Sequence, residues 1–466
     1  MVHTESTTRQ NEGFGLWTGV FVVVASMIGV GILTTSGFTV ASVHSHQWAW
    51  VLWSTGGLLA VCGALTQAEL VSRVPESGGD YVILKTAYGP LCGFLSGWLS
   101  MVLGFAGPIA ASSKAAARYL IASLQDSSQP VSQLAVSIIA TAIVGAMAWL
   151  HSHNFERSSR TQSVTTLVKI GLLAAFVIIG LSIGMRQNEF PSDWPEKIDI
   201  SLVSVSLTSL IYISYAFTGW NGIGFIAGEM RNPRRNLPLS IFLGTGIVLV
   251  IYLGCNLVYS LAWTAPELQK LAEERGFDAL APIAELSARR LFGEDTANVI
   301  SFVVFLMLIA SVSAYVLTGA RILQAMGQAR HFPRWAAARN SHGVPTRATI
   351  LQSAIALCFV WSASLESIIV VSSLGLGAFS MLTISTIFSY RKHAFGIEPS
   401  FLCPLYPVVP AIFLIGTGAL TAVTAWNKPQ EGLASLTCVV VGVVAFYLWS
   451  WANRSVQGNE KSPEQG

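Results

Sequence analysis

The sequence is poor in charged side chains. Asp, Glu, Lys and Arg make up 11% of the 466 residues, whereas soluble globular proteins carry roughly 25%. Hydrophobic residues make up 52%, and the mean hydropathy is +0.58. This composition excludes a soluble domain with a single core. The net charge of +3 gives no indication of a nucleic-acid partner, and none is expected.

The chain also lacks the residue patterns of enzymes and metal sites. Its six cysteines form no CxxC pair, so neither a disulfide framework nor a zinc site is indicated. No Gly-rich phosphate loop, nucleophile motif or catalytic dyad is present. We therefore expect no enzyme activity, no cofactor, no metal and no ATP-driven transport. A cleavable signal peptide is not expected, since residues 1–15 are polar and the first apolar run is long enough to span a membrane.

What the chain does contain is a series of apolar runs of about 20 residues, the length that crosses a hydrocarbon layer of about 30 Å. They predict an all-α integral membrane protein with twelve transmembrane helices. The expected spans are Leu16–Val43, Ala49–Val71, Leu91–Leu124, Val131–His151, Val164–Met185, Val203–Gly228, Leu239–Trp263, Ala297–Ala325, Ala348–Trp361, Ile368–Tyr390, Val408–Trp426 and Leu433–Trp451.

Basic side chains predict the orientation of these spans. With the N-terminus in the cytoplasm, most of the 27 Lys and Arg fall in inner segments, as the positive-inside rule requires. We expect a multi-pass protein of the cell (inner) membrane with both termini cytoplasmic. Its expected parts are an N-terminal segment (1–15), a transport core of ten helices (16–390), two further helices (404–452) and a cytoplasmic tail (453–466). The long outer loop Thr264–Asn298 is expected to form a helical cap.

Two spans contain glycines that weaken the helix. Span one holds Gly29 and Gly31, and span six holds three glycines and an asparagine within Ser214–Gly224. Each glycine costs about 1 kcal/mol relative to alanine inside a helix. Such glycines either permit close helix packing or mark interrupted helices. Because the two weak points lie five spans apart, they favour a secondary transporter built from two inverted five-helix repeats, with discontinuous helices 1 and 6.

The residues at these points resemble the amino acid–polyamine–organocation superfamily, more narrowly the L-type amino acid transporter group and its bacterial relatives. Three patches carry the resemblance: Ile28–Ile32; Ala68–Leu70 with Pro75–Tyr81; and Gly219–Asn221 with Glu229 and Asn232–Pro238. The resemblance covers essentially the whole chain. It implies a five-plus-five inverted repeat followed by two extra helices, with the substrate site between spans one and six.

The resemblance also implies which residues bind the substrate. The substrate carboxylate would meet backbone amides of Gly29, Val30 and Gly31, and its ammonium would meet carbonyls near Met27 and in the second break. Val30 lacks the hydroxyl that is common at its position. The second break would contribute an aromatic gate at Tyr215, together with Phe217, Thr218 and Asn221.

Three cationic residues fall inside spans. A lysine in a membrane helix costs about 2.5–3.5 kcal/mol on insertion scales, so Lys169 should either snorkel to the inner interface or find partners. The resemblance implies that Lys169 replaces a sodium ion, reaching carbonyls at the first break and hydroxyls of span eight, Ser311 or Ser313. Lys114 and Arg118, near the outer end of span three, are expected to snorkel, or alternatively to line an outer vestibule.

The resulting functional prediction is a sodium-independent secondary transporter, either an exchanger or proton-coupled, of small-to-medium neutral L-amino acids. One alternative is an amine or polyamine permease, which would need acidic residues in its cavity. Another is an amino-acid sensor that does not transport. The expected partners are the substrate and the lipid bilayer. No disulfide-linked heavy chain is expected, because the outer loop Ser123–Pro130, where some relatives carry that bond, has no cysteine. The sequence does not indicate an oligomeric state.

Overall fold

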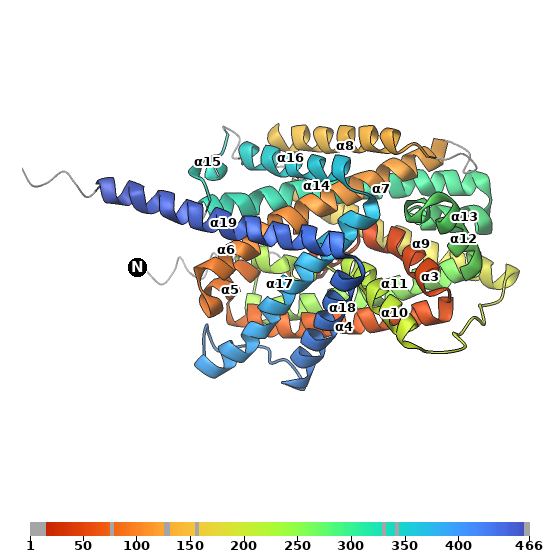
Figure 1. The fold of residues 1–466 in the computed structure, drawn as a ribbon, viewed down its shortest axis with the longest axis horizontal. Helices are drawn as coiled ribbons and strands as arrows, with labels where there is room; N and C mark the ends of the chain where they lie inside the picture. The colour runs from red at the N-terminus through yellow and green to blue at the C-terminus, as the bar shows by residue number, and fades with distance from the viewer. Residues whose placement is uncertain are drawn as a thin grey trace, which may run out of the picture.

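Helices account for all regular structure in the part of the chain that the structure describes. The computed structural model describes the backbone of residues 15–74, 79–124, 131–153, 158–328, 332–340 and 344–460. Figure 1 shows long helices packed side by side. Within these residues, nine helices are long and apolar enough to cross a membrane, and one bent pair adds a tenth. Every one of the twelve predicted spans coincides with a helix or with a broken pair of helices.

The first half of the chain contains spans one to five. Span three includes a π-helical turn, η1, and a short helix, α5, precedes it. The elements are α2 (Leu16–Met27), α3 (Val30–Val43), α4 (His46–Arg73), α5 (Asp80–Tyr88), α6 (Pro90–Leu99), η1 (Ser100–Ala106), α7 (Gly107–Leu124), α8 (Gln133–His153) and α9 (Ser158–Gln187).

The second half repeats this order and adds two helices. Spans six and nine are the short ones, with 17 residues each in α10 and α16. The elements are α10 (Ile200–Ala216), η2 (Gly222–Glu229), α11 (Pro233–Ala262), α12 (Ala265–Arg275), η3 (Phe277–Leu280), α13 (Ile283–Phe292), α14 (Glu294–Gln328), α15 (Arg334–Ala337), α16 (Thr346–Ser362), α17 (Leu365–His393), α18 (Val408–Asn427) and α19 (Pro429–Glu460).

The two halves pack as counterparts. Helix α4 packs on α11, α7 on α14 and α8 on α16, and in each pair the second helix lies five spans after the first. The cross-contacts match as well, since α8 also packs on α14 and α16 on α7. Because five is odd, counterpart helices cross the membrane in opposite directions. This pattern is the predicted inverted repeat.

The loop between spans seven and eight forms the expected helical cap, made of α12, η3 and α13. At the right of Figure 1, α12 and α13 lie against α3. Phe38 of α3 is fully buried between Tyr212 of α10 and Phe277 of the cap, at ring-centroid distances of 5.6 and 5.9 Å. The cap therefore closes this end of the bundle over the two broken helices.

The prediction that Lys114 and Arg118 snorkel is wrong. Both side chains are buried, at 4% and 5% exposure. Lys114 donates hydrogen bonds to the carbonyls of Val360 (3.1 Å) and Ala363 (2.5 Å) at the end of α16. Arg118 pairs with Asp278 of the cap at 3.1 Å. Their partners lie more than a hundred residues away, so the sequence neighbourhood gave no sign of them.

A second charged cluster lies at the opposite end of the bundle. Glu69 of α4 is fully buried and pairs with Arg73 at 2.8 Å and with Arg391 of α17 at 2.6 Å. It also accepts a hydrogen bond of 2.8 Å from the backbone amide of Cys403. These contacts hold the segment between α17 and α18 against the end of α4.

Asp278 is predicted to be essential for the stability of the closed cap. Besides Arg118, it accepts hydrogen bonds from the amides of Leu365 and Glu366 at the start of α17. Breaking a buried ion pair by removing one partner costs about 3–5 kcal/mol. Asp278→Asn should therefore lower the midpoint of thermal unfolding in detergent, followed by tryptophan fluorescence. The exposed Asp295→Asn is the matched control, and equal midpoints for both variants would contradict the role of Asp278.

Candidate functional site

The first break separates α2 from α3 at the predicted glycines. Helix α2 ends at Met27 and α3 begins at Val30, with the two axes bent by 45°. Gly29 stands at the N-cap position of α3, and no side chain caps the helix. The first amides of a helix have no intrahelical acceptor and carry a partial positive charge. An anionic group is therefore favoured beside Gly29, Val30 and Gly31.

The second break lies where α10 ends, at Ala216. Thr218 donates its hydroxyl to the carbonyl of Tyr215 at 2.7 Å and so caps the end of the helix. Gly219 has φ +110°, a left-handed conformation that favours glycine, and a Cβ there would lie 2.5 Å from the carbonyl oxygen of Ser26. A side chain at position 219 would therefore push the two breaks apart.

The two breaks touch each other in the middle of the bundle. A Cβ on Gly31 would lie 2.4 Å from Cα of Ala216, so α3 approaches α10 to backbone distance. The hydroxyl of Tyr252, on α11, donates to the carbonyls of Met27 at 2.8 Å and Ala216 at 3.1 Å. A single buried phenol thus joins the carboxyl ends of both interrupted helices. Nothing in the sequence distinguishes Tyr252 except its position inside span seven.

Asn221, predicted to bind substrate, is held by an aspartate that the sequence analysis noted only as part of a motif. Asp80, the first residue of α5, accepts hydrogen bonds of 2.7 Å from the side-chain amides of Asn221 and of Gln67 on α4. Burial raises the pKa of the Asp80 carboxyl, and the two hydrogen bonds act in the opposite direction. Residues 75–78 of the same motif lie outside the described residues.

Lys169 is buried at 5% exposure and donates a hydrogen bond of 2.7 Å to Ser311 of α14. It therefore finds a partner inside the bundle and does not snorkel. Among the described residues Ser311 is the sole hydrogen-bond acceptor of Lys169, and no carbonyl of the first break accepts from it. Ser313 lies elsewhere, since its hydroxyl forms a hydrogen bond of 2.7 Å with His151 of α8.

The remaining predicted site residues are largely enclosed. Val30 and Met27 are 2% and 3% exposed. Tyr215, the predicted gate, is 5% exposed, and its hydroxyl has no partner among the described residues. Phe217 lies against Trp53 and Tyr252, at ring-centroid distances of 5.9 and 5.1 Å, in the core between α4 and α11. Its ring contributes to packing, and substrate contact by Phe217 stays a prediction.

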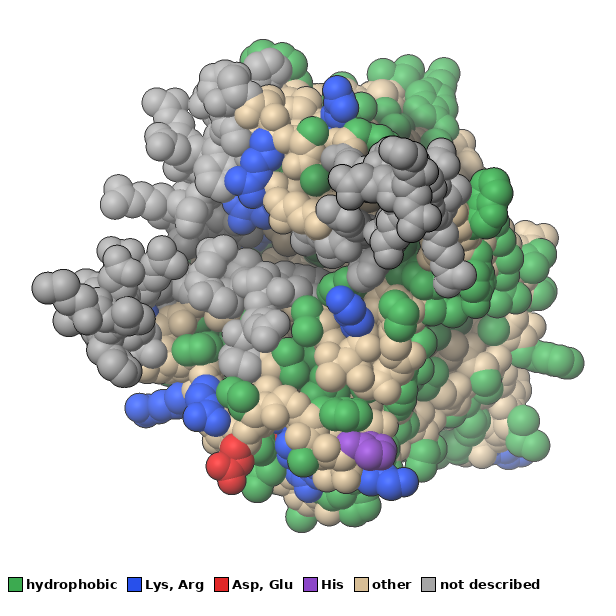
Figure 2. All heavy atoms as spheres, turned by 90° about the vertical axis from the view of Figure 1, so that its left-hand side faces the viewer, with side chains coloured by type: hydrophobic (Ala, Val, Ile, Leu, Met, Phe, Trp, Pro, Cys, Tyr) green, Lys and Arg blue, Asp and Glu red, His purple; other side chains and the backbone are tan. Residues whose placement is uncertain are grey.

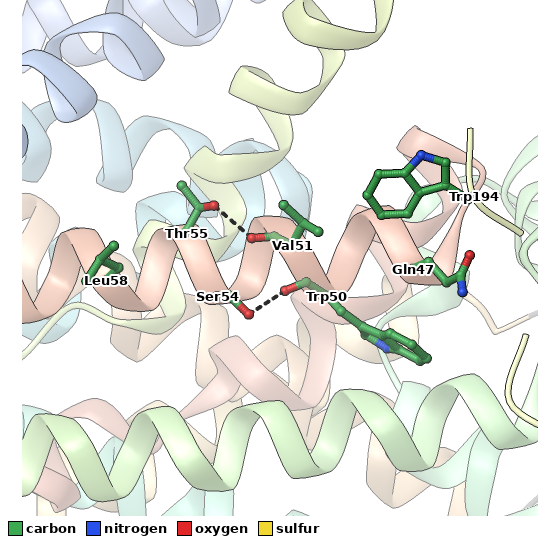
Figure 3. Close-up of a pocket in the computed structure, with 7 residues that line it drawn as sticks. All are labelled: Gln47, Trp50, Val51, Ser54, Thr55, Leu58 and Trp194. Carbon is green, nitrogen blue, oxygen red and sulfur yellow. Dashed lines mark hydrogen bonds between the residues drawn. The ribbon is translucent and has the colours of Figure 1, made fainter. Parts of the chain in front are cut away.

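An open groove of about 450 Å³ lies on the outer surface of α4, away from the breaks. Figure 3 shows its lining residues along α4, with Trp194 beside them. Val51, Leu58 and Trp194 expose large apolar surfaces there. Such surfaces are expected on a helix face that contacts lipid, so we assign the groove no substrate.

Comparison with known proteins gives matches along nearly the whole chain. A family model described as "Amino acid permease" matches residues 14–447. The chain is 25% identical to the b(0,+)-type amino acid transporter 1 of Mus musculus, over 96% of this chain and 91% of the relative. It is 25% identical to the serine/threonine exchanger SteT of Bacillus subtilis, over 96% and 98%. It is 24% identical to the human cystine/glutamate transporter, over 93% and 84%.

Gly31→Val is predicted to abolish amino acid uptake without preventing membrane insertion. Any side chain at position 31 collides with Ala216, so α3 and α10 cannot keep their contact. Uptake of radiolabelled amino acids into proteoliposomes measures the effect. Gly145→Val is the matched control, since a Cβ at Gly145 of α8 meets nothing within 4 Å. Normal uptake by Gly31→Val would show that the contact is not required.

Asp80→Asn is predicted to lower substrate affinity about tenfold. The carboxylate accepts from two amides, whereas an asparagine offers one acceptor and turns a donor toward the other amide. Hydrogen bonds to charged groups contribute about 1.5–3 kcal/mol, which supports this magnitude. Isothermal titration of the purified protein measures it. Asp199→Asn, at the N-cap of α10, is the control, and equal affinities in all three proteins would count against a role for Asp80.

Proposed function

The chain belongs to the amino acid permease family and is a multi-pass membrane transporter of amino acids, and from this premise we propose that it moves small-to-medium neutral L-amino acids without sodium. The observation that carries the proposal is the contact between the two breaks. Uncapped amides start α3, and carbonyls that accept from the Tyr252 hydroxyl end α2 and α10. A zwitterion presents a carboxylate and an ammonium group to these two ends.

Substrate binding in this proposal uses the residues of both breaks. The amides of Gly29, Val30 and Gly31 receive the carboxylate, and the carbonyls near Met27 and Tyr215 receive the ammonium. Since the Tyr252 hydroxyl already donates to Met27, the ammonium shares that carbonyl or displaces the phenol. Tyr215 covers the substrate, while Thr218 and Asn221 shape the second break.

Sodium independence rests on Lys169. Its ammonium group donates to Ser311 and joins α9 to α14. A fixed positive charge at this place removes the need for a bound cation to hold the same helices together. The hydroxyl of Ser313 pairs with His151, so we assign only Ser311 as the partner of Lys169.

We propose that the protein lies in the cell (inner) membrane with both termini on the cytoplasmic side. In Figure 1 the end of α19 lies at the same side as α5, α6 and α15, opposite the cap. Figure 2 looks onto this side, where Lys and Arg side chains are spread and acidic ones are scarce. This distribution supports a cytoplasmic face by the positive-inside rule.

An amine substrate is the alternative that one observation favours. Asp80 brings a carboxyl group to the second break through Asn221, and a cationic substrate needs such a group. Against it, both carboxyl oxygens already accept hydrogen bonds from amides. Two acidic residues at the ends of membrane-spanning helices pair with cations, Glu69 with Arg391 and Glu366 with Lys428.

Uptake into proteoliposomes is predicted to be the same with and without sodium. Unlabelled neutral amino acids inside the vesicles should accelerate counterflow of labelled ones, and spermidine and agmatine should not compete. Lys169→Ala should reduce uptake strongly, whereas Lys270→Ala, an exposed lysine of the cap, should not. Strict sodium dependence would refute the role of Lys169. Competition by the amines would favour the alternative, and binding without counterflow would indicate a sensor.

A further inference from the structure

Tyr315, a residue that the sequence analysis did not single out, lies against the first break. It is near the middle of α14, and its side chain is half-buried. A Cβ built on Gly29 would lie 3.1 Å from the Tyr315 hydroxyl oxygen. The phenol of a third helix therefore reaches the residue that separates α2 from α3.

The Tyr315 hydroxyl has no hydrogen-bond partner among the described residues. Two other phenols near the breaks do have acceptors: Tyr252 donates to Met27 and Ala216, and Tyr119 donates to the carbonyl of Leu33 at 2.8 Å. The hydroxyl is not among the fully buried polar atoms, so an acceptor from outside the chain can reach it. An acceptor supplied from outside the chain would satisfy it.

The neighbouring groups indicate which acceptor fits. Gly29 is the N-cap of α3, and the first amides of α3 are not capped by any side chain. The hydroxyl and these amides are all donors, and they lie beside the same residue. The side chain of Val30 has no hydroxyl, so it contributes no further donor to this group. A carboxylate, which accepts several hydrogen bonds at once, matches this set of donors.

A neighbouring ring holds the phenol in place. Phe105, in the π-helical turn η1, meets Tyr315 edge to face, with ring centroids 6.4 Å apart and an interplanar angle of 71°. π-helical turns inside α-helices occur frequently at functional sites. Here the turn places an aromatic side chain from span three against the ring of Tyr315 from span eight.

We propose that Tyr315 binds the substrate carboxylate by donating its hydroxyl, together with the amides at the start of α3. The inference rests on the proposed function and adds to it a side-chain ligand from α14. Because the carboxylate is common to all amino acids, Tyr315 should affect affinity for every substrate by a similar factor. The order of preference among substrate side chains should not change.

Tyr315→Phe tests this proposal because it removes only the hydroxyl. The probes are L-serine, L-threonine and L-leucine with their methyl esters, as competitors of counterflow in proteoliposomes. In the variant, the inhibition constants of the free amino acids should rise about tenfold or more, as for loss of a hydrogen bond to a charged group. Those of the esters, which lack the carboxylate, should change less than twofold. Tyr119→Phe is the control, since its lost hydrogen bond is internal and should affect acids and esters equally.

The outcomes separate this inference from the proposed function. Equal changes for acids and esters in Tyr315→Phe, or free-acid constants within twofold of wild type, would overturn the role of Tyr315 alone. If the esters do not compete even with wild type, the free amino acids alone test the proposal. A rise of about tenfold in the inhibition constants of all three free amino acids in Tyr315→Phe then supports it. If wild type binds none of the three amino acids, the proposed function fails and this inference fails with it.

Discussion

The contact between the two broken helices is the constraint on which the rest of the structure depends. Unpaired backbone groups at membrane depth are tolerated only where protein or a water-lined cavity covers them. Here each break covers the other: Gly31 meets Ala216, and Gly219 meets Ser26. Tyr252 then joins the carbonyl ends of α2 and α10 with one hydroxyl. The glycines are required because the backbones approach so closely, and the interruption itself leaves the amides of α3 open to a ligand.

The charged clusters at the two ends of the bundle both involve α17. At its start, the amides of Leu365 and Glu366 donate to Asp278, which also pairs with Arg118 of α7. At its end, Arg391 pairs with Glu69 of α4. A transporter that opens to each side in turn must weaken one cluster while the other holds. Since α17 takes part in both, this one helix connects the two charged clusters.

The sequence predicted what depends on local composition. Apolar runs gave the spans, and paired glycines gave the breaks to within a residue or two. The family resemblance, rather than local composition, implied that Lys169 reaches a hydroxyl of span eight, and Lys169 donates to Ser311. What could not be predicted depends on contacts between distant segments. Lys114 meets the end of α16, Arg118 meets the cap, and Asp80 meets the side-chain amide of Asn221. Nothing near these residues in the sequence indicates those partners.

The charges around the breaks support the proposal that the substrate carries no net charge. Each break places a carbonyl end (of α2 or α10) beside an amide end (of α3 or η2), and their partial charges of about −0.5 and +0.5 offset each other. Lys169 and Asp80 add one charge of each sign when both are ionised, and each is held by neutral partners. A net cation or anion would upset this balance in a region of low dielectric, where uncompensated charge is costly. A zwitterion adds a dipole and no net charge, which supports the proposed neutral amino acid over a polyamine.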